Sequence, residues 1–140
     1  MPGKVLIVDD EPDVLLLLRV NLEAAGYETV LAADGETALN RIDDSDPDVV
    51  LLDIMMPVMD GWGVLRVLSD RETAPRVVVV SAKSSDRDVV RALTSGALDY
   101  ITKPFDPDAL INIVERTMTT SVEELEAHRQ DTIERCGGVQ

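Results

Sequence analysis

The sequence predicts an α/β fold in which helices cover both faces of a parallel β-sheet. Short apolar runs alternate five times with segments whose apolar residues recur at helical spacing. Two of the runs, Val49–Leu52 and Val77–Val80, contain no polar residue, which is typical of strands buried on both faces. Because parallel strands need long crossover connections, this alternation indicates a doubly wound (βα)5 unit.

Each expected element has its own local signal. The expected strands are Lys4–Asp10, Tyr27–Ala33, Val49–Asp53, Arg76–Ser81 and Ala97–Thr102. Proline in the first turn, Asp or Ser at the N-cap, and glycine after the last turn define the intervening helices. We expect those helices to begin near Pro12, Gly35, Trp62, Asp86 and Pro107, and the first and fourth to stop at Gly26 and Gly96.

The first helix has more apolar residues than one buried stripe needs. Val14, Leu17, Leu18, Leu22 and Ala25 follow helical spacing and are expected to face the sheet. Three further apolar residues lie off this stripe: Leu15, Leu16 and Val20. They indicate either a broad buried face with ordinary exposed leucines or a surface that docks a partner.

The expected domain spans residues 3–118, and residues 119–140 form a C-terminal tail without strand signals. Ser121 and Glu124 fit a capping box, so the tail could be an added helix, an extension of the last helix or a frayed end. Its apolar residues are too sparse to predict a core of their own: Val122, Leu125, Ile133 and Cys136. We expect the ending Cys136–Gln140 to be mobile and His128 to be a solvated helix residue.

Composition excludes several classes of function. The 140 residues include 27 acidic and 13 basic side chains, a net charge of −14, which disfavours direct binding to nucleic acid or to an anionic membrane. The single cysteine, Cys136, excludes an internal disulfide and a zinc site built from several cysteines. No apolar run is long enough for a signal peptide or a membrane span. A soluble, cytoplasmic protein without an effector domain is the resulting expectation.

Reactive side chains follow four of the five expected strands. They are Asp9 and Asp10, Asp53, Ser81 and Lys103. If the first and third strands are neighbours, the direction of winding reverses between them and opens a crevice at their carboxyl ends. Three carboxylates gathered there would repel one another unless a cation joined them. Oxygen ligands without His or Cys favour Mg²⁺, particularly beside a phosphate group.

These residues resemble the receiver domain of two-component response regulators, over about residues 3–118. The motifs are Val8-Asp9-Asp10-Glu11-Pro12, Leu52-Asp53-Ile54-Met55-Met56-Pro57, Asp60-Gly61, Ser81-Ala82 and Tyr100-Ile101-Thr102-Lys103-Pro104-Phe105. The resemblance implies a five-stranded sheet in the order 2-1-3-4-5 and a cis peptide bond between Lys103 and Pro104.

The resemblance also implies roles for individual residues. Asp53 would accept a phosphoryl group from a histidine kinase or histidine phosphotransfer protein. Asp10, Asp53 and the backbone carbonyl of Met55 would bind Mg²⁺ directly, and Asp9 would bind it largely through water. Lys103 and Ser81 would contact phosphoryl oxygens. Such a protein is a phosphoacceptor rather than an enzyme.

Further roles concern the switch and its lifetime. Ser81 and Tyr100 would move after phosphorylation and change the face formed by the fourth helix, the fifth strand and the fifth helix. That face would control a partner protein. The chain would be a monomer, or a weak dimer formed through the same face. Met55 and Lys83 would tune the loss of the phosphoryl group.

Alternative functions remain open at this point. A stand-alone receiver and the receiver part of a longer transcription factor or output enzyme share these motifs. A haloacid-dehalogenase-like phosphatase also uses an Asp nucleophile and Mg²⁺, but the Asp-x-Asp after its first strand and its cap are not visible. A flavodoxin-like protein would need a phosphate-cradling loop after the first strand, and that loop is also missing.

Overall fold

The computed structural model describes residues 3–137 and contains one five-stranded parallel sheet in the order β2-β1-β3-β4-β5. The sheet and its order confirm the expected fold. Its strands are β1 (Lys4–Val8), β2 (Glu28–Ala32), β3 (Val49–Leu52), β4 (Arg76–Ser81) and β5 (Asp99–Thr102). The helices are α1 (Pro12–Ala24), α2 (Gly35–Ser45), α3 (Gly61–Ser69), α4 (Asp86–Thr94), α5 (Pro107–Thr119) and α6 (Val122–Gly137).

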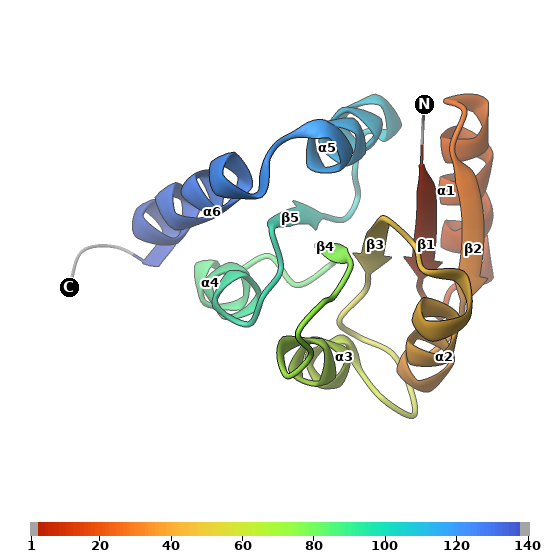
Figure 1. The fold of residues 1–140 in the computed structure, drawn as a ribbon, viewed down its shortest axis with the longest axis horizontal. Coiled ribbons are helices and arrows are strands. Elements are labelled where there is room, and N and C mark those ends of the chain that lie inside the picture. Colours follow the sequence, from red (N-terminus) through yellow and green to blue (C-terminus); the bar gives the residue numbers. More distant parts are fainter. Residues whose placement is uncertain (1–2, 138–140) are drawn as a thin grey trace.

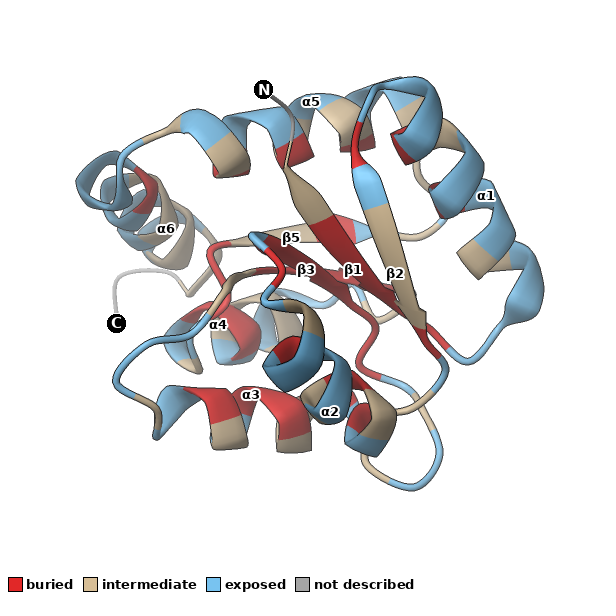
Figure 2. Ribbon diagram, turned by 45° about the vertical axis from the view of Figure 1, so that its right-hand side comes forward, coloured by how far each residue is buried: buried red, intermediate tan, exposed pale blue. Residues whose placement is uncertain are grey.

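The sheet separates two hydrophobic layers. Helices α1 and α5 cover one face, and α2, α3 and α4 cover the other (Figure 1). Alternate residues of each central strand face opposite layers, so Val49 and Leu51 pack toward α1 and α5. Val50 and Leu52 pack toward α2, α3 and α4. Strand β3 is therefore buried along both faces (Figure 2), which explains why it contains no polar residue.

The helix ends follow the expected capping signals. The side chains of Asp34, Asp60 and Ser85 accept hydrogen bonds from backbone N–H groups in the first turns of α2, α3 and α4. Gly26 and Gly96 both have positive φ angles, 97° and 119°, just after α1 and α4. Among residues 3–137, no helix has the length and apolarity that crossing a membrane requires.

The buried stripe of α1 differs from the expected one. Leu18 and Leu22 are buried, but Leu17 is 44% exposed and Leu15 is half-buried. Because successive helical residues are about 100° apart, a face centred on Leu18 and Leu22 includes Leu15 and turns Leu17 toward solvent. Leu16 and Val20 are also exposed, at 58% and 56%.

The C-terminal segment forms a helix that rests on the domain. A hydrogen bond from the backbone N–H of Glu124 to Ser121 Oγ caps its start, as the sequence indicates. The expectation that its apolar residues are too sparse for a core is wrong for two positions, because Leu125 is 3% exposed and Ile133 packs against the layer containing α4. Those residues need no core of their own, since an existing one receives them. The expected mobile end falls partly on 138–140, outside the described residues.

Candidate phosphoacceptor and metal site

The topology brings the acidic residues together. Strands β1 and β3 are parallel neighbours, with Val8 opposite Leu52. Asp9 and Asp53 each follow these residues directly, and the Asp53 backbone N–H donates to the Val8 carbonyl at 3.0 Å. Strand β2 lies on the other side of β1, so the winding direction reverses between β1 and β3. The site therefore lies at the switch point where α/β sheets bind ligands.

The three carboxylates form a compact group. One oxygen from each of Asp9, Asp10 and Asp53 lies within 4.8 Å of the others. Asp9 is 2% exposed and Asp53 is 4% exposed, whereas Asp10 is open to solvent. Two buried carboxyl groups thus lie next to an exposed one, so solvent and a ligand can reach the group from the side of Asp10.

Lys103 supplies the positive charge. Its Nζ lies 2.6 Å from Asp9 Oδ2 and 3.3 Å from Asp53 Oδ2, and the side chain is 13% exposed. The Lys103–Pro104 peptide bond is cis, as the resemblance implies. Glu11 Oε1 is a third acidic neighbour, 3.6 Å from Nζ. The sequence shows Glu11 only as a residue opening α1, so its contact with Lys103 is a feature that sequence reasoning missed.

The pKa of Asp53 reflects competition among these charges. Burial raises this pKa, and the neighbouring Asp9 carboxylate raises it further, while Lys103 and the Met55 backbone N–H lower it. The net direction is upward, although the Lys103 ion pair alone would predict the opposite. The folded-state pKa of Asp53 exceeds its unfolded-state value. The stabilisation from protonated Asp53 is therefore complete below the unfolded-state pKa and is lost as pH rises through the folded-state pKa.

Lys103 shows the complementary effect. Burial lowers its pKa, but the hydrogen bond to Asp9 and the charge of Asp53 outweigh burial, and the net direction is upward. The stabilisation from this ion pair is therefore complete below the ordinary pKa of lysine and is lost as pH rises through the folded-state value. Lys103 therefore keeps its proton and its positive charge at neutral pH.

Ser81 and Tyr100 are connected through the backbone of Lys83. The Tyr100 hydroxyl donates to the Lys83 carbonyl at 2.6 Å, and the Lys83 N–H donates to Ser81 Oγ at 3.3 Å. Burial is the largest influence on the Tyr100 hydroxyl and raises its pKa. Sequence reasoning selected all three residues but missed this connection, since no sequence pattern marks a side chain that bonds a backbone carbonyl.

A hollow of about 450 Å³ opens beside the carboxylates. Asp10, Met55 and Lys83 contribute to its lining. Met55 is 56% exposed and extends from the loop that follows Asp53. The two residues expected to tune dephosphorylation therefore lie at one opening, together with one of the expected metal ligands.

Gly61 permits the loop after Asp53 to fold back tightly. Its N–H donates to the Ile54 carbonyl at 2.9 Å. A Cβ atom at this position would lie 2.5 Å from the Asp53 carbonyl oxygen and 2.7 Å from Ile54 Cα, both of them backbone atoms that cannot easily move. Glycine is therefore required by a close approach beside the phosphoacceptor candidate.

The donor set fits a magnesium ion. Three carboxylates and one lysine leave two net negative charges, which one Mg²⁺ balances. All candidate ligands are oxygen atoms, as Mg²⁺ prefers, and exposed Asp10 leaves room for the waters that this ion retains. Asp9, Asp10 and Asp53 are the residues that would hold it.

Comparison with known proteins identifies the class. Residues 5–115 match the family profile described as the response regulator receiver domain. The chain belongs to this family, whose members act in two-component signal transduction and partner with histidine kinases. Response regulators are signalling proteins, and receiver domains bind Mg²⁺ at an acidic pocket.

Curated relatives include longer regulators. The chain is 41% identical over 107 residues to the alkaline phosphatase synthesis transcriptional regulatory protein PhoP of Bacillus subtilis, covering 76% of this chain and 45% of that protein. It is 46% identical over 107 residues to the transcriptional regulatory protein KdpE of Mycobacterium tuberculosis, covering 76% and 47%. The chain thus spans about half the length of these relatives.

Solved structures agree with this assignment. The receiver domain of Francisella response regulator 1452 superposes with a TM-score of 0.80 at 35% identity, covering 83% of this chain and 96% of that one. A CheY-like receiver domain protein from Methanospirillum hungatei gives a TM-score of 0.79 at 28% identity, covering 91% and 99%.

The acidic cluster predicts a metal-dependent gain in stability. Mg²⁺ should stabilise the wild-type fold by about 2.7 kcal/mol when its free concentration is 100 times Kd. Asp10→Asn should lose most of this gain, because it removes an exposed carboxylate from the cluster. The measurement is thermal unfolding with and without Mg²⁺.

The matched control is Asp44→Asn, the same chemical change at an exposed position on α2. It should keep the full effect of Mg²⁺. Equal stabilisation of wild type and Asp10→Asn would show that the ion binds elsewhere.

Proposed function

We propose that this receiver accepts a phosphoryl group on Asp53 from a phosphohistidine of a histidine kinase or histidine phosphotransfer protein. The observation that carries the proposal is the contact of Lys103 Nζ with Asp53 Oδ2, 3.3 Å, inside a group of three carboxylates. This arrangement presents a carboxylate nucleophile beside a fixed cation. A phosphoryl group needs that pair of features to be transferred and held.

Phosphoryl transfer to Asp53 requires no general base. A carboxylate oxygen of Asp53 attacks phosphorus, a P–O bond forms, and the P–N bond to the histidine breaks with its electron pair returning to the imidazole. Asp53 needs no proton removed, since an ionised carboxylate is already a nucleophile. When bound, Mg²⁺ supplies charge neutralisation to the phosphoryl oxygens, with Asp9, Asp10, Asp53 and the Met55 carbonyl as its proposed ligands.

Lys103 is proposed to change partners during the transfer. It now donates to Asp9 and Asp53. A phosphoryl group on Asp53 adds up to one further negative charge and three acceptor oxygens within reach of the same ammonium group. Lys103 would then neutralise an equatorial oxygen, and Ser81 would donate its hydroxyl hydrogen to another.

The response of the fold is proposed to pass through Lys83. Ser81 and Tyr100 both bond to the Lys83 backbone, at the start of the loop that leads into α4. If the Ser81 hydroxyl turns toward the phosphoryl group, it gives up the Lys83 N–H, and the loop and Tyr100 can rearrange. The face formed by α4, β5 and α5 would change and thereby control a partner protein.

Apolar side chains on α1 are the proposed contact for the phosphodonor. Leu16, Leu17 and Val20 are 58%, 44% and 56% exposed on the helix that follows Asp9 and Asp10. Leu16 and Val20 lie off the stripe expected from the sequence, and their exposure is compatible with ordinary exposed apolar residues as well as with docking. Their position on the helix that follows Asp9 and Asp10 is what supports the docking interpretation. Met55 and Val58, 56% and 79% exposed, add apolar surface in the loop after Asp53.

Phosphorylation at Asp53 is the direct test. Incubation with acetyl phosphate and Mg²⁺ should add the mass of one phosphoryl group, and borohydride reduction should convert the labelled residue at position 53 to homoserine. Asp53→Asn should show no addition and remain folded. Asp44→Asn should be labelled like wild type, and homoserine at any other position would refute the assignment.

Met55 is expected to slow hydrolysis of the phosphorylated protein. Its apolar side chain beside the hollow cannot orient water, whereas an amide can. Met55→Asn should therefore speed decay of the aspartyl phosphate roughly fivefold, about 1 kcal/mol of activation free energy. Decay is followed by intact mass after removal of the donor.

Val58→Asn is the matched control, because it introduces the same amide into the same loop at a residue that does not line the hollow. It should decay like wild type. The same rate for Met55→Asn and wild type would remove Met55 from this role.

A further inference from the structure

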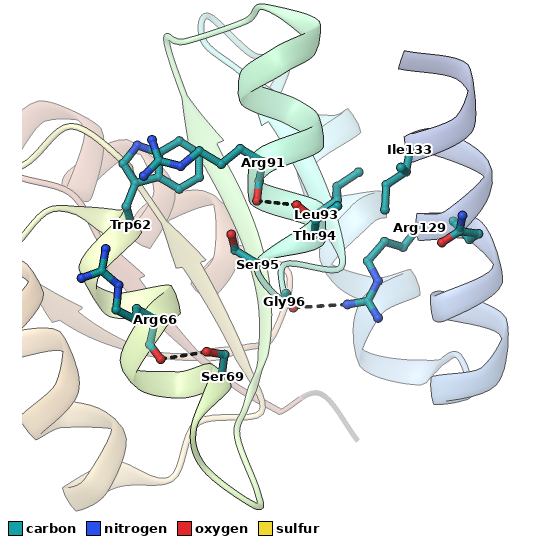
Figure 3. A pocket seen from close by; sticks show the side chains of 11 residues that line it. Trp62, Arg66, Ser69, Arg91, Leu93, Thr94, Ser95, Gly96, Arg129 and Ile133 are labelled. Atoms are coloured by element: carbon teal, nitrogen blue, oxygen red, sulfur yellow. Dashed lines mark hydrogen bonds between the residues drawn. The ribbon is translucent and has the colours of Figure 1, made fainter. Parts of the chain in front are cut away.

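Helix α6 lies along the β5 edge of the sheet, between α4 and α5 (Figures 1 and 2). Its fourth residue, Leu125, is 3% exposed. Two turns later, Ile133 packs against the core layer that contains Ala92 and Leu93 of α4. Figure 3 shows Ile133 directed from α6 toward Leu93. The helix is thus held by apolar burial on one side.

Polar contacts join α6 to the same elements. The Asp99 carboxylate, at the start of β5, pairs with Arg116 of α5 and lies 3.6 Å from His128 Nε2 of α6. His128 lies in a helix, as the sequence predicts, with its side chain 38% exposed. Arg129 Nη1 approaches the Gly96 carbonyl between α4 and β5 at 3.5 Å (Figure 3).

These contacts cover the proposed output face. Ile133 packs on the layer that contains α4, Arg129 approaches the α4–β5 turn, and His128 lies beside Asp99 of β5, which also pairs with Arg116 of α5. Leu125 is buried in the first turns of the same helix. We propose that α6 is an intramolecular occupant of the α4–β5–α5 face, which an output partner can bind only after α6 leaves. This inference rests on the proposed function, which assigns output to that face.

The residues of α6 that contact the α4–β5–α5 face indicate what kind of output partner could bind there. The face accepts an amphipathic helix with two aliphatic side chains eight positions apart, as Leu125 and Ile133 are. A basic or protonated side chain between them would meet Asp99. The competing partner is therefore a protein helix of the same pattern as α6.

Docking of α6 should oppose phosphorylation. In the arrangement that holds α6, Asp53 is paired with Lys103, and Ser81 Oγ accepts from Lys83. Helix α6 joins α4 to β5, so it fits one relative placement of these elements. Phosphorylation is proposed to move the loop entering α4, and a docked α6 resists that movement. Because coupling between two sites is reciprocal, releasing α6 should favour phosphorylation of Asp53.

The test compares Leu125→Asp with Val122→Asp in the whole chain. Both changes place one carboxylate in the first turns of α6, but Leu125 is buried and Val122 is 44% exposed. Hydrogen exchange over residues 122–137 reports docking of α6, and the rate of labelling by acetyl phosphate reports coupling. Ile133→Asp serves as a second release variant, and circular dichroism checks the fold.

We expect faster exchange in α6 for Leu125→Asp and Ile133→Asp, with labelling about fivefold or more faster than in Val122→Asp. Released α6 with unchanged labelling would overturn the regulatory role. Unchanged exchange in both release variants would overturn the docking itself. Failure of wild type and all variants to be labelled would instead contradict the proposed function.

Discussion

The ion pair that Lys103 makes with Asp9 and Asp53 is the interaction on which the site depends. Two carboxylates that are 2% and 4% exposed would repel each other strongly without a cation between them. Lys103 does not outweigh burial and the Asp9 carboxylate together, so the pKa of Asp53 remains raised, with burial as the larger cause. The negative charge of this cluster, together with exposed Asp10, is what we propose attracts a divalent cation. The same lysine, 3.3 Å from Asp53 Oδ2, is the group that we propose neutralises an incoming phosphoryl group.

The topology explains why these charges meet at all. Asp9 and Asp53 are far apart in sequence, and they become neighbours because β1 lies between β2 and β3. The residues of the proposed switch belong to the same sheet and the loop that follows it. Ser81 ends β4, Tyr100 lies in β5, and the backbone of Lys83 connects them at the entry to α4. A change at one sheet edge therefore has a short physical route to the surface that α6 covers.

The strands, the sheet class and the acidic cluster could be predicted because each depends on local pattern or on where parallel strands end. Asp9, Asp10, Asp53 and Lys103 come together as expected. Contacts that depend on the rotation of a helix could not be predicted so well, as the exposure of Leu17 shows. The packing of α6 against the domain could not be predicted, because Leu125 and Ile133 are too few to form a core by themselves. Ile133 packs instead on the core layer that contains α4, and Leu125 is 3% exposed. No pattern in one sequence shows that Asp99 joins α5 to α6.

The charge balance at Asp53 can be measured directly. Carboxyl ¹³C chemical shifts of the Mg²⁺-free protein, followed from acidic to neutral pH, give the pKa of Asp53 without reference to any partner. We predict a midpoint above the ordinary value of about 3.9, and a higher midpoint still in Lys103→Met, because that change removes the cation but keeps the buried Asp9. Titration of Asp53 at or below the ordinary value, or no response to loss of Lys103, would contradict this prediction.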